Sequence, residues 1–228
     1  MLVINAAVPA AEGFRAGMAV RLERGAVVQT GEDLLPRPAE RVLDLAGDFL
    51  LPGFVDVHIH GCMGADVMQG EAALRRMSRA LYGMGVSAFL PTTMSAPEAE
   101  TRRAVAAVRA VMDAPEPKGA RVLGLHMEAP FLNPEKAGAQ RAECLQHPDW
   151  EHFLHLTGGD IGAVRMITLA PELSGAEAFI RQAVQAGITV SLGHSAATAE
   201  EAHAAADWGA SHVTHTFNAQ PALHHREP

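Results

Sequence analysis

The stretch F54-V-D-V-H-I-H-G-C-M-G64 decides between the fold classes open to this chain. Its apolar and polar residues alternate with the two-residue period of a β-strand, so Asp56, His58 and His60 share one face and aliphatic side chains take the other. The glycines that follow lack the G-x-G-x-x-G pattern that receives a pyrophosphate, which argues against a nucleotide-binding open sheet. The polar face therefore has to look into a closed interior.

Further along the chain, strand-like apolar runs alternate with Ala-rich amphipathic segments, which is the βα alternation of a parallel sheet. The expected strands are 54–60, 86–92, 121–128, 164–171, 189–194 and 212–218. They are apolar on both faces, as expected where helices cover one side and a barrel interior the other. We predict an α/β fold of the (β/α)8 TIM-barrel type, here with only about six βα units in residues 52–228. The competing arrangement is an open, doubly wound sheet.

Helix signals fall between these strands. Three segments resemble capping boxes: Ser95-x-x-Glu98, Ser174-x-x-Glu177 and Thr198-x-x-Glu201. Three glycines follow helical segments as C-caps: Gly85, Gly187 and Gly209.

Residues 1–51 read differently, because short apolar segments broken by Gly and Pro indicate small antiparallel strands and no helix. The expected strands there are 18–22, 26–29, 41–45 and 48–51. We predict a small β-sandwich-like domain, incomplete in this chain, with its boundary near Leu51-Pro52-Gly53.

Composition excludes several classes of function. With 48% hydrophobic and 19% charged residues, the 228-residue chain should be globular. The net charge of −8 is spread along the chain without a Lys/Arg block, so neither nucleic acid nor a membrane surface is an expected partner. No signal peptide and no apolar run of about 18 residues is present. Cys62 and Cys144 form no C-x-x-C pair, which fits a reducing cytoplasm.

Histidine and glutamate recur at the carboxyl ends of different expected strands. These residues are His58, His60, Glu128, His194 and His215. Because strand ends converge on one mouth of a barrel, their nitrogen and oxygen atoms can meet around a divalent metal. Zn is the first candidate, and Fe, Mn and Co suit the same ligands.

Each residue also has a structural interpretation. The H-x-H pair can be hydrogen-bonded core histidines, and Glu128 can form a buried salt bridge to an arginine. For His126, one layer deeper, a satisfied core histidine is the favoured interpretation. His147, His152 and His155 lie in a polar segment and are interpreted as surface or packing residues.

Several segments together resemble the N-acetylglucosamine-6-phosphate deacetylases, a branch of the amidohydrolase superfamily. They are LPGFVDVHIHG (51–61), GLHMEAPFLN (124–133), SLGHS (191–195), and THTFNA (214–219) followed by HHREP (224–228). The resemblance implies hydrolysis of the N-acetyl group of N-acetylglucosamine 6-phosphate, giving glucosamine 6-phosphate and acetate, in amino-sugar catabolism.

The resemblance also implies roles for particular residues. The main metal ligands fall on Glu128, His194 and His215, and His58 with His60 can hold a second ion. Substrate contacts match Ala139, Gln140, Asn218, Ala219 and Arg226. The arginine is expected to reach the sugar phosphate, across the interface of a homodimer. Gln140 stands where other members place a histidine that polarises the acetyl carbonyl.

A complete barrel needs about 250 residues, and the family's general acid-base aspartate would lie beyond residue 228. We therefore expect a fragment, truncated at the C-terminus, that binds metal but hydrolyses amides poorly. Two alternatives remain: another amidohydrolase, either a cyclic amidase or a deaminase, and a catalytically incompetent metal-binding fragment. Against the first, neither lysine of the chain, Lys118 or Lys136, ends an expected strand.

Overall fold

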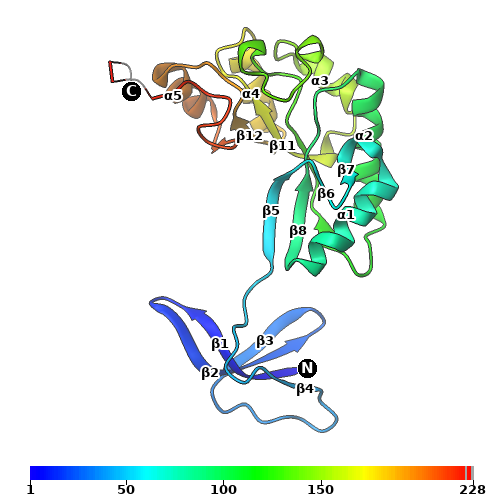
Figure 1. Cartoon of the computed structure of the whole chain (residues 1–228), viewed down its shortest axis with the longest axis vertical. Helices are drawn as coiled ribbons and strands as arrows, with labels where there is room; N and C mark the ends of the chain where they lie inside the picture. Colours follow the sequence, from blue (N-terminus) through cyan, green and yellow to red (C-terminus); the bar gives the residue numbers. More distant parts are fainter. Residues whose placement is uncertain (224, 227–228) are drawn as a thin grey trace. The chain divides into compact units, whose positions relative to one another are not determined.

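The computed structural model describes residues 1–223, 225 and 226, and the chain divides into two compact units, Met1–Gly53 and Phe54–Pro228 (Figure 1). No helix in the described part of the chain is long and apolar enough to cross a membrane.

The first unit is a four-stranded sheet in the order β3-β2-β1-β4. Its strands are β1 (Leu2–Ala10), β2 (Gly13–Glu23), β3 (Ala26–Gly31) and β4 (Val42–Asp44). β2 pairs antiparallel with β1 and β3, whereas β4 pairs parallel with β1. The expectation of antiparallel strands is therefore wrong for β4, and no strand was expected at 2–10. A β-sandwich-like arrangement stays a prediction.

A buried arginine fastens the segment between β3 and β4 to this sheet. Arg21 of β2 is 4% exposed, and its Nε donates to Glu40 Oε1 at 2.9 Å. Its Nη2 donates to the carbonyl of Leu35 at 2.7 Å. These bonds hold the segment between β3 and β4 against the sheet, and β4 then pairs with β1. Phe49, in the expected strand 48–51, makes only an isolated bridge to Ala7.

The second unit contains parallel strands that follow one another in sequence order. They are β5 (Phe54–Ile59), β8 (Val86–Pro91), β9 (Arg121–Val122), β10 (Leu125–Met127), β11 (Val164–Leu169), β12 (Thr189–Leu192) and β13 (His212–Val213). β5-β8-β9 and β10-β11-β12-β13 form two sheets, which a parallel bridge between Thr92 and His126 connects. The α/β class is confirmed. The order never reverses among the described strands, unlike that of a doubly wound sheet.

The third expected strand is divided into β9 and β10 at Gly124. A Cβ on Gly124 would lie 2.3 Å from Cγ of Arg165, and its φ of 152° is unfavourable for other residues. The break lets β9 pair with β8 while β10 pairs with β11.

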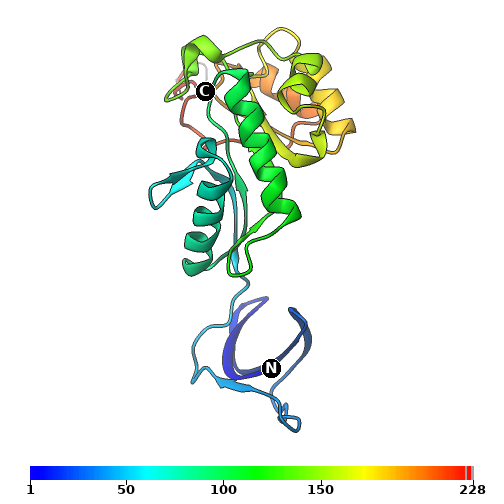
Figure 2. The same ribbon diagram turned by 90° about the vertical axis from the view of Figure 1, so that its right-hand side faces the viewer.

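Helices connect the strands. They are α1 (Glu71–Gly83), α2 (Glu98–Asp113), α3 (Trp150–Leu156), α4 (Ala176–Gln185) and α5 (Ala199–Trp208). Single 3-10 turns lie at η1 (Val67–Gln69), η2 (Pro134–Lys136), η3 (Ala142–Cys144) and η4 (Ile161–Ala163), and a small hairpin is formed by β6 (Gly61–Cys62) and β7 (Ala65–Asp66). Figure 2 shows α1 and α2 side by side in front of the strands, and their buried residues, such as Leu74 and Val108, join one core with Phe89 and Val122 of the sheet.

The parallel sheet is strongly curved. With β9 and β10 counted as one position, β5 and β13 are the first and sixth strands, and in a flat sheet they would lie about 24 Å apart. Here the rings of His58, on β5, and His215, just after β13, have centroids 5.6 Å apart. His126 Nδ1 also donates to the carbonyl of Val57, two strands away, at 2.9 Å. The curvature brings the carboxyl ends of separate strands together around one interior.

Candidate metal centre

Glu128 lies at the centre of a cluster of histidines. It follows β10, its side chain is 1% exposed, and four imidazole Nε2 atoms lie 3.1–3.5 Å from its carboxylate oxygens. These imidazoles belong to His58, His60, His194 and His215. The structure thus brings together His58 of β5, His60 directly after β5, and residues of the loops that follow β10, β12 and β13.

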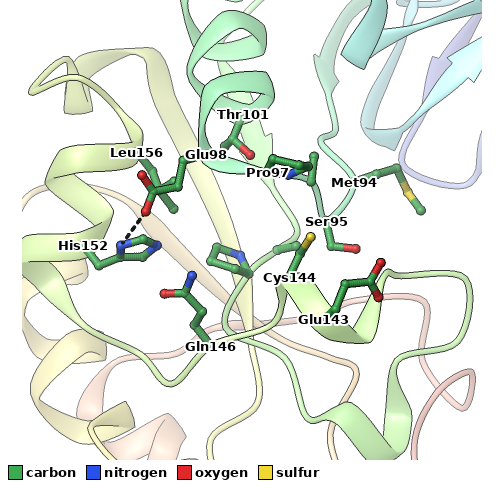
Figure 3. Close-up of a pocket in the computed structure, with 13 residues that line it drawn as sticks. Met94, Ser95, Pro97, Glu98, Thr101, Glu143, Cys144, Gln146, His152 and Leu156 are labelled. Carbon is green, nitrogen blue, oxygen red and sulfur yellow. Dashed lines mark ion pairs between the residues drawn. The ribbon is translucent and has the colours of Figure 1, made fainter.

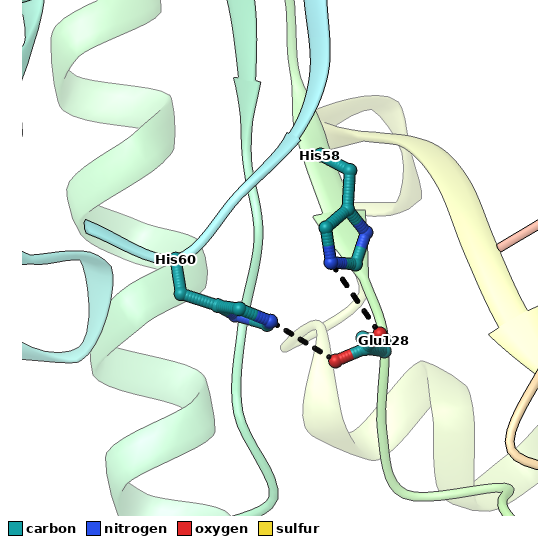
Figure 4. A group of neighbouring side chains, drawn as sticks. All are labelled: His58, His60 and Glu128. Atoms are coloured by element: carbon teal, nitrogen blue, oxygen red, sulfur yellow. Dashed lines mark ion pairs between the residues drawn. The ribbon is translucent and has the colours of Figure 1, made fainter. Parts of the chain in front are cut away.

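The two carboxylate oxygens face different histidines. Oε2 lies 3.1 Å from His60, and Oε1 lies 3.5 Å from His58 (Figure 4). Oε1 also lies 3.3 Å from His194 and 3.2 Å from His215. Glu128 is therefore shared by two groups that could hold a cation, one with His58 and His60 and the other with His194 and His215.

Backbone carbonyls determine which imidazole nitrogen carries hydrogen. Nδ1 of His60 faces the carbonyl of Thr92 at 3.0 Å, and Nδ1 of His194 faces that of Lys136 at 2.8 Å. Nδ1 of His215 lies 3.1 Å from the carbonyl of Asn218. Because a carbonyl only accepts, each Nδ1 donates, and in the neutral ring the Nε2 lone pair points at the cluster. This is how metal-binding histidines are oriented in proteins.

The carboxylate and the histidines perturb one another electrostatically. Burial by itself would raise the pKa of Glu128, but the adjacent imidazoles of His194 and His60 outweigh it and hold that pKa well below its usual range. Burial also opposes charge on His60 and His194, yet the adjacent Glu128 carboxylate raises the pKa of both. For His58 burial dominates and lowers the pKa. The cluster is thus an ionised carboxylate beside a neutral His58.

The donor set fits a divalent cation. Glu128 Oε1 and His58 Nδ1 are buried without a hydrogen-bond partner, although buried polar atoms are normally paired. His194 and His215 bring their Nε2 atoms within 3.0 Å of each other, an approach that suits two lone pairs directed at one ion. Mixed imidazole and carboxylate ligands suit Zn, Fe, Mn or Co.

The two histidines after β12 and β13 have an unusual backbone. His194 has a φ of 50° and His215 a φ of 30°, in the left-handed region that non-glycine residues seldom occupy. Such conformations cost about 1–3 kcal/mol and persist where surrounding contacts enforce them. They turn the chain at the strand end and leave both imidazoles directed at Glu128.

The structure tests the two interpretations that involve no metal, one for His126 and one for Glu128. His126 is 1% exposed and pairs both ring nitrogens, Nδ1 with the Val57 carbonyl at 2.9 Å and Nε2 with Thr168 Oγ1 at 2.7 Å. Its interpretation as a satisfied core histidine is confirmed. The arginine proposed as an alternative partner of Glu128 is replaced, among the described contacts, by histidines and Gln140.

The residues expected to contact substrate have different surroundings. Gln140 is buried and donates from Nε2 to Glu128 Oε2 at 2.5 Å. Asn218 folds back on the turn of His215, and the carbonyl of Ala219 accepts a hydrogen bond from the Ser195 amide at 3.1 Å. Ala139 and Arg226 are solvent-exposed. Residues 224, 227 and 228 of the HHREP segment lie outside the described residues.

Glu172 is a carboxylate that sequence reasoning missed. Its Oε1 accepts from Asn133 Nδ2 at 2.9 Å and from the Ala196 amide at 2.6 Å, and its Oε2 accepts from Ser195 Oγ at 2.7 Å. Glu172 thus joins the loop after β11 to Asn133 in the loop after β10 and to Ser195 and Ala196, which follow His194 after β12. The available signal was its position directly after the expected strand 164–171, next to the strand end at which the candidate ligands of other strands were found.

A separate cavity of about 230 Å³ lies between α2 and α3 (Figure 3). It contains the Glu98–His152 ion pair, in which Oε1 and Nδ1 are 3.6 Å apart. Its lining includes Ala129 and Pro130, directly after Glu128, but none of the clustered histidines. A second hollow of about 260 Å³ is lined by Ala139 and Arg141. Met94 and Ser95 line both.

Comparison with protein families matches residues 49–227 to the Amidohydrolase family. The chain is 38% identical to the N-acetylglucosamine-6-phosphate deacetylase of Homo sapiens over 198 residues, which is 84% of this chain and 48% of the human protein. It is 35% identical to the N-acetylgalactosamine-6-phosphate deacetylase of Escherichia coli O157:H7, over 82% of this chain and 50% of that protein. The chain thus spans about half the length of these curated relatives.

A solved structure is also similar. It is a mutant N-acetyl-D-glucosamine-6-phosphate deacetylase from Mycobacterium smegmatis in complex with N-acetyl-D-glucosamine-6-phosphate. It superimposes with a TM-score of 0.86 at 30% identity and covers 100% of this chain and 58% of that one.

Proposed function

The chain belongs to the amidohydrolase family, and we propose that it carries the metal site and part of the substrate site of an N-acetylglucosamine-6-phosphate deacetylase. The reaction would hydrolyse the N-acetyl group to give glucosamine 6-phosphate and acetate. The observation that carries this proposal is the buried Glu128 carboxylate with four imidazole Nε2 atoms 3.1–3.5 Å away. The similarity to deacetylases of phosphorylated amino sugars supports the substrate class.

In this proposal Glu128, His194 and His215 hold one ion, and His58 and His60 hold a second that shares Glu128. Zn is the first candidate for both. A bound divalent ion supplies Lewis-acid polarisation of a carbonyl and makes water a usable nucleophile near neutral pH. The protein's own contribution is orientation, since the carbonyls of Thr92, Lys136 and Asn218 hold three of the imidazoles in place.

We propose that Gln140 contacts the substrate amide in addition to Glu128. Its Nε2 carries two hydrogens, of which one is donated to Glu128. The other faces Met94 Sδ at 3.7 Å, which is a weak acceptor. That hydrogen is available for an acetyl carbonyl, a neutral substitute for the histidine of other members.

The remaining substrate contacts are proposed on resemblance. Ala139, Asn218 and Ala219 would line the sugar, and Arg226 would bind the phosphate through its planar guanidinium. The homodimer, the closed (β/α)8 barrel and the cytoplasmic location belong to the same proposal.

Metal content and acetate release test this function. We expect the purified protein to contain Zn or a similar ion, and both E128Q and H194N to lose it. H155N is the matched control, because His155 is 57% exposed and pairs with Glu98 away from the cluster. Full metal content in E128Q would contradict the proposed site.

A comparison of substrates tests the proposed sugar and the proposed reaction class. Acetate should be released from N-acetylglucosamine 6-phosphate faster than from the N-acetylgalactosamine analogue, the substrate named for the Escherichia coli relative. Faster release from the latter would change the assigned sugar. Turnover of dihydroorotate or adenine instead would assign the chain to another amidohydrolase branch.

A further inference from the structure

The orientation of the Gln140 amide is determined by a backbone group. The amide N–H of Ser95 donates to Gln140 Oε1 at 2.6 Å. Because a backbone N–H can only donate, the oxygen of the side-chain amide must face Ser95 and the nitrogen must face Glu128. Gln140 is 7% exposed, so solvent does not compete for either position.

This amide acts on a torsion that is otherwise soft. The terminal torsion of glutamate has broad, roughly two-fold preferences, so a carboxylate without a partner turns easily. Gln140 Nε2 bonds Oε2 of Glu128 at 2.5 Å, and the same oxygen lies 3.1 Å from His60 Nε2. The other oxygen is thereby left facing His58, His194 and His215.

We infer that Gln140 is a positioning residue, which holds the Glu128 carboxylate so that Oε2 faces His60 while Oε1 faces His58, His194 and His215. The inference rests on the proposed metal site. It assigns Gln140 a role in metal affinity that is separate from any contact with substrate.

The Gln140 amide carries no charge, which is consistent with this positioning role. A lysine or arginine at this position would satisfy Oε2 but would also cancel the negative charge that attracts a divalent ion. Glu128 is the only carboxylate in either candidate group of the described residues. A neutral donor orients the oxygen and leaves the charge in place.

Zinc affinity tests the role. We expect Q140L, which removes both hydrogen bonds, to weaken zinc binding by about 10–100-fold, the usual effect of losing a partner that orients a ligand. Q140N, too short to reach Ser95 and Glu128 together, should weaken it similarly. Q140H should keep zinc affinity near that of the wild type, because a neutral imidazole can accept from Ser95 through Nδ1 and donate to Glu128 through Nε2.

The measurement is competition of the intact protein with a chromophoric zinc chelator, with Co²⁺ absorption as a second readout of ligand geometry. Q146L is the matched control, since Gln146 lies in the same loop region but lines the cavity between α2 and α3. Circular dichroism confirms that each variant is folded, and Q140N provides the test if Q140L is not.

Two outcomes are distinguishable. Zinc binding by the wild type together with unchanged affinity in Q140L and Q140N overturns the positioning role and leaves the proposed function intact. A wild-type protein that binds no zinc or cobalt overturns the proposed function and the inference with it.

Discussion

Two histidines with similar apolar sequence neighbours have different roles, and their hydrogen bonds distinguish these roles. His126 and His58 both lie inside apolar strands. His126 has both nitrogens paired, and burial lowers its pKa to about 4, so it remains neutral in the core. His58 has an unpaired Nδ1 and an Nε2 directed at Glu128. The number of available nitrogens, rather than burial, distinguishes a candidate ligand from a core residue.

His126 belongs to a buried polar chain whose loss should be measurable. Thr168 Oγ1 lies 2.7 Å from His126 Nε2 and 2.7 Å from Thr214 Oγ1. T168V leaves His126 Nε2 without a partner, whereas Thr214 Oγ1 keeps its hydrogen bond with Ser191 Oγ at 2.7 Å. We expect this variant to lower the free energy of unfolding by about 1–3 kcal/mol. Urea denaturation of the purified protein measures this loss.

T93V is the matched control. Thr93 is fully buried, and its Oγ1 has no hydrogen-bond partner, so replacing the hydroxyl by a methyl group leaves no new group unpaired. Its unfolding free energy should equal or exceed that of the wild type. Equal stability of T168V and T93V would show that the chain from His126 to Thr214 contributes nothing.

Among the elements, helix starts were harder to predict than helix ends. Only Thr198 and Glu201 form the expected capping box. The expected boxes at Ser95 and Ser174 are wrong, because α2 begins after Pro97 and α4 after Gly175 with no side-chain cap. Ser95 Oγ instead accepts from the amide of Arg141. By contrast, Gly85, Gly187 and Gly209 all have positive φ after α1, α4 and α5, which confirms them as stop signals.

The close approach of strand ends depends on Gly193. A Cβ there would lie 2.7 Å from Cβ of Thr214 and 2.9 Å from Cγ2 of Thr168. We expect G193A to lower the unfolding free energy by about 1–3 kcal/mol through overpacking. Because His194 is the next residue, zinc affinity should fall as well. Urea denaturation and chelator competition measure the two effects.

G83A provides the comparison for that variant. Gly83 ends α1, and an added Cβ would meet no atom within 4 Å. Alanine should therefore be neutral or stabilise by up to about 1 kcal/mol. If G193A behaved like G83A, the steric role of Gly193 would be refuted.

For the whole molecule, the candidate ligands all belong to the unit Phe54–Pro228. Metal binding stabilises what it binds by mass action, by about 2.7 kcal/mol at a free concentration 100 times the dissociation constant. Zinc should therefore slow amide hydrogen exchange in β10, β12 and the loops after them. Exchange in residues 1–53 should not change.

Hydrogen exchange with mass spectrometry, with and without a chelator, checks this difference. The E128Q variant is the control, because it should show no zinc-dependent protection in either unit. Equal zinc-dependent protection of both units would mean that metal binding is not confined to the cluster.

The features that the sequence predicted correctly are mostly local ones. The expected strands of the second unit follow from periodicity, which neighbouring residues determine, although the third is divided in two and only His212–Val213 of the expected strand 212–218 forms a strand. The glycine stops follow from backbone conformation. The positions of Glu128, His194 and His215 at strand ends were visible for the same reason. The parallel pairing of β4 was not, because it joins β4 to β1, a strand about 40 residues earlier in the chain, where Leu2 pairs with Val42.

The sequence by itself determined which residues end the strands and that they carry nitrogen and oxygen ligands. Only the tertiary structure decided that four imidazoles share one carboxylate, that His126 is satisfied elsewhere, and that Gln140 and Glu172 orient their neighbours. The physical reason is that periodicity reports the direction of a side chain, whereas its partners depend on sheet curvature and loops that join distant residues.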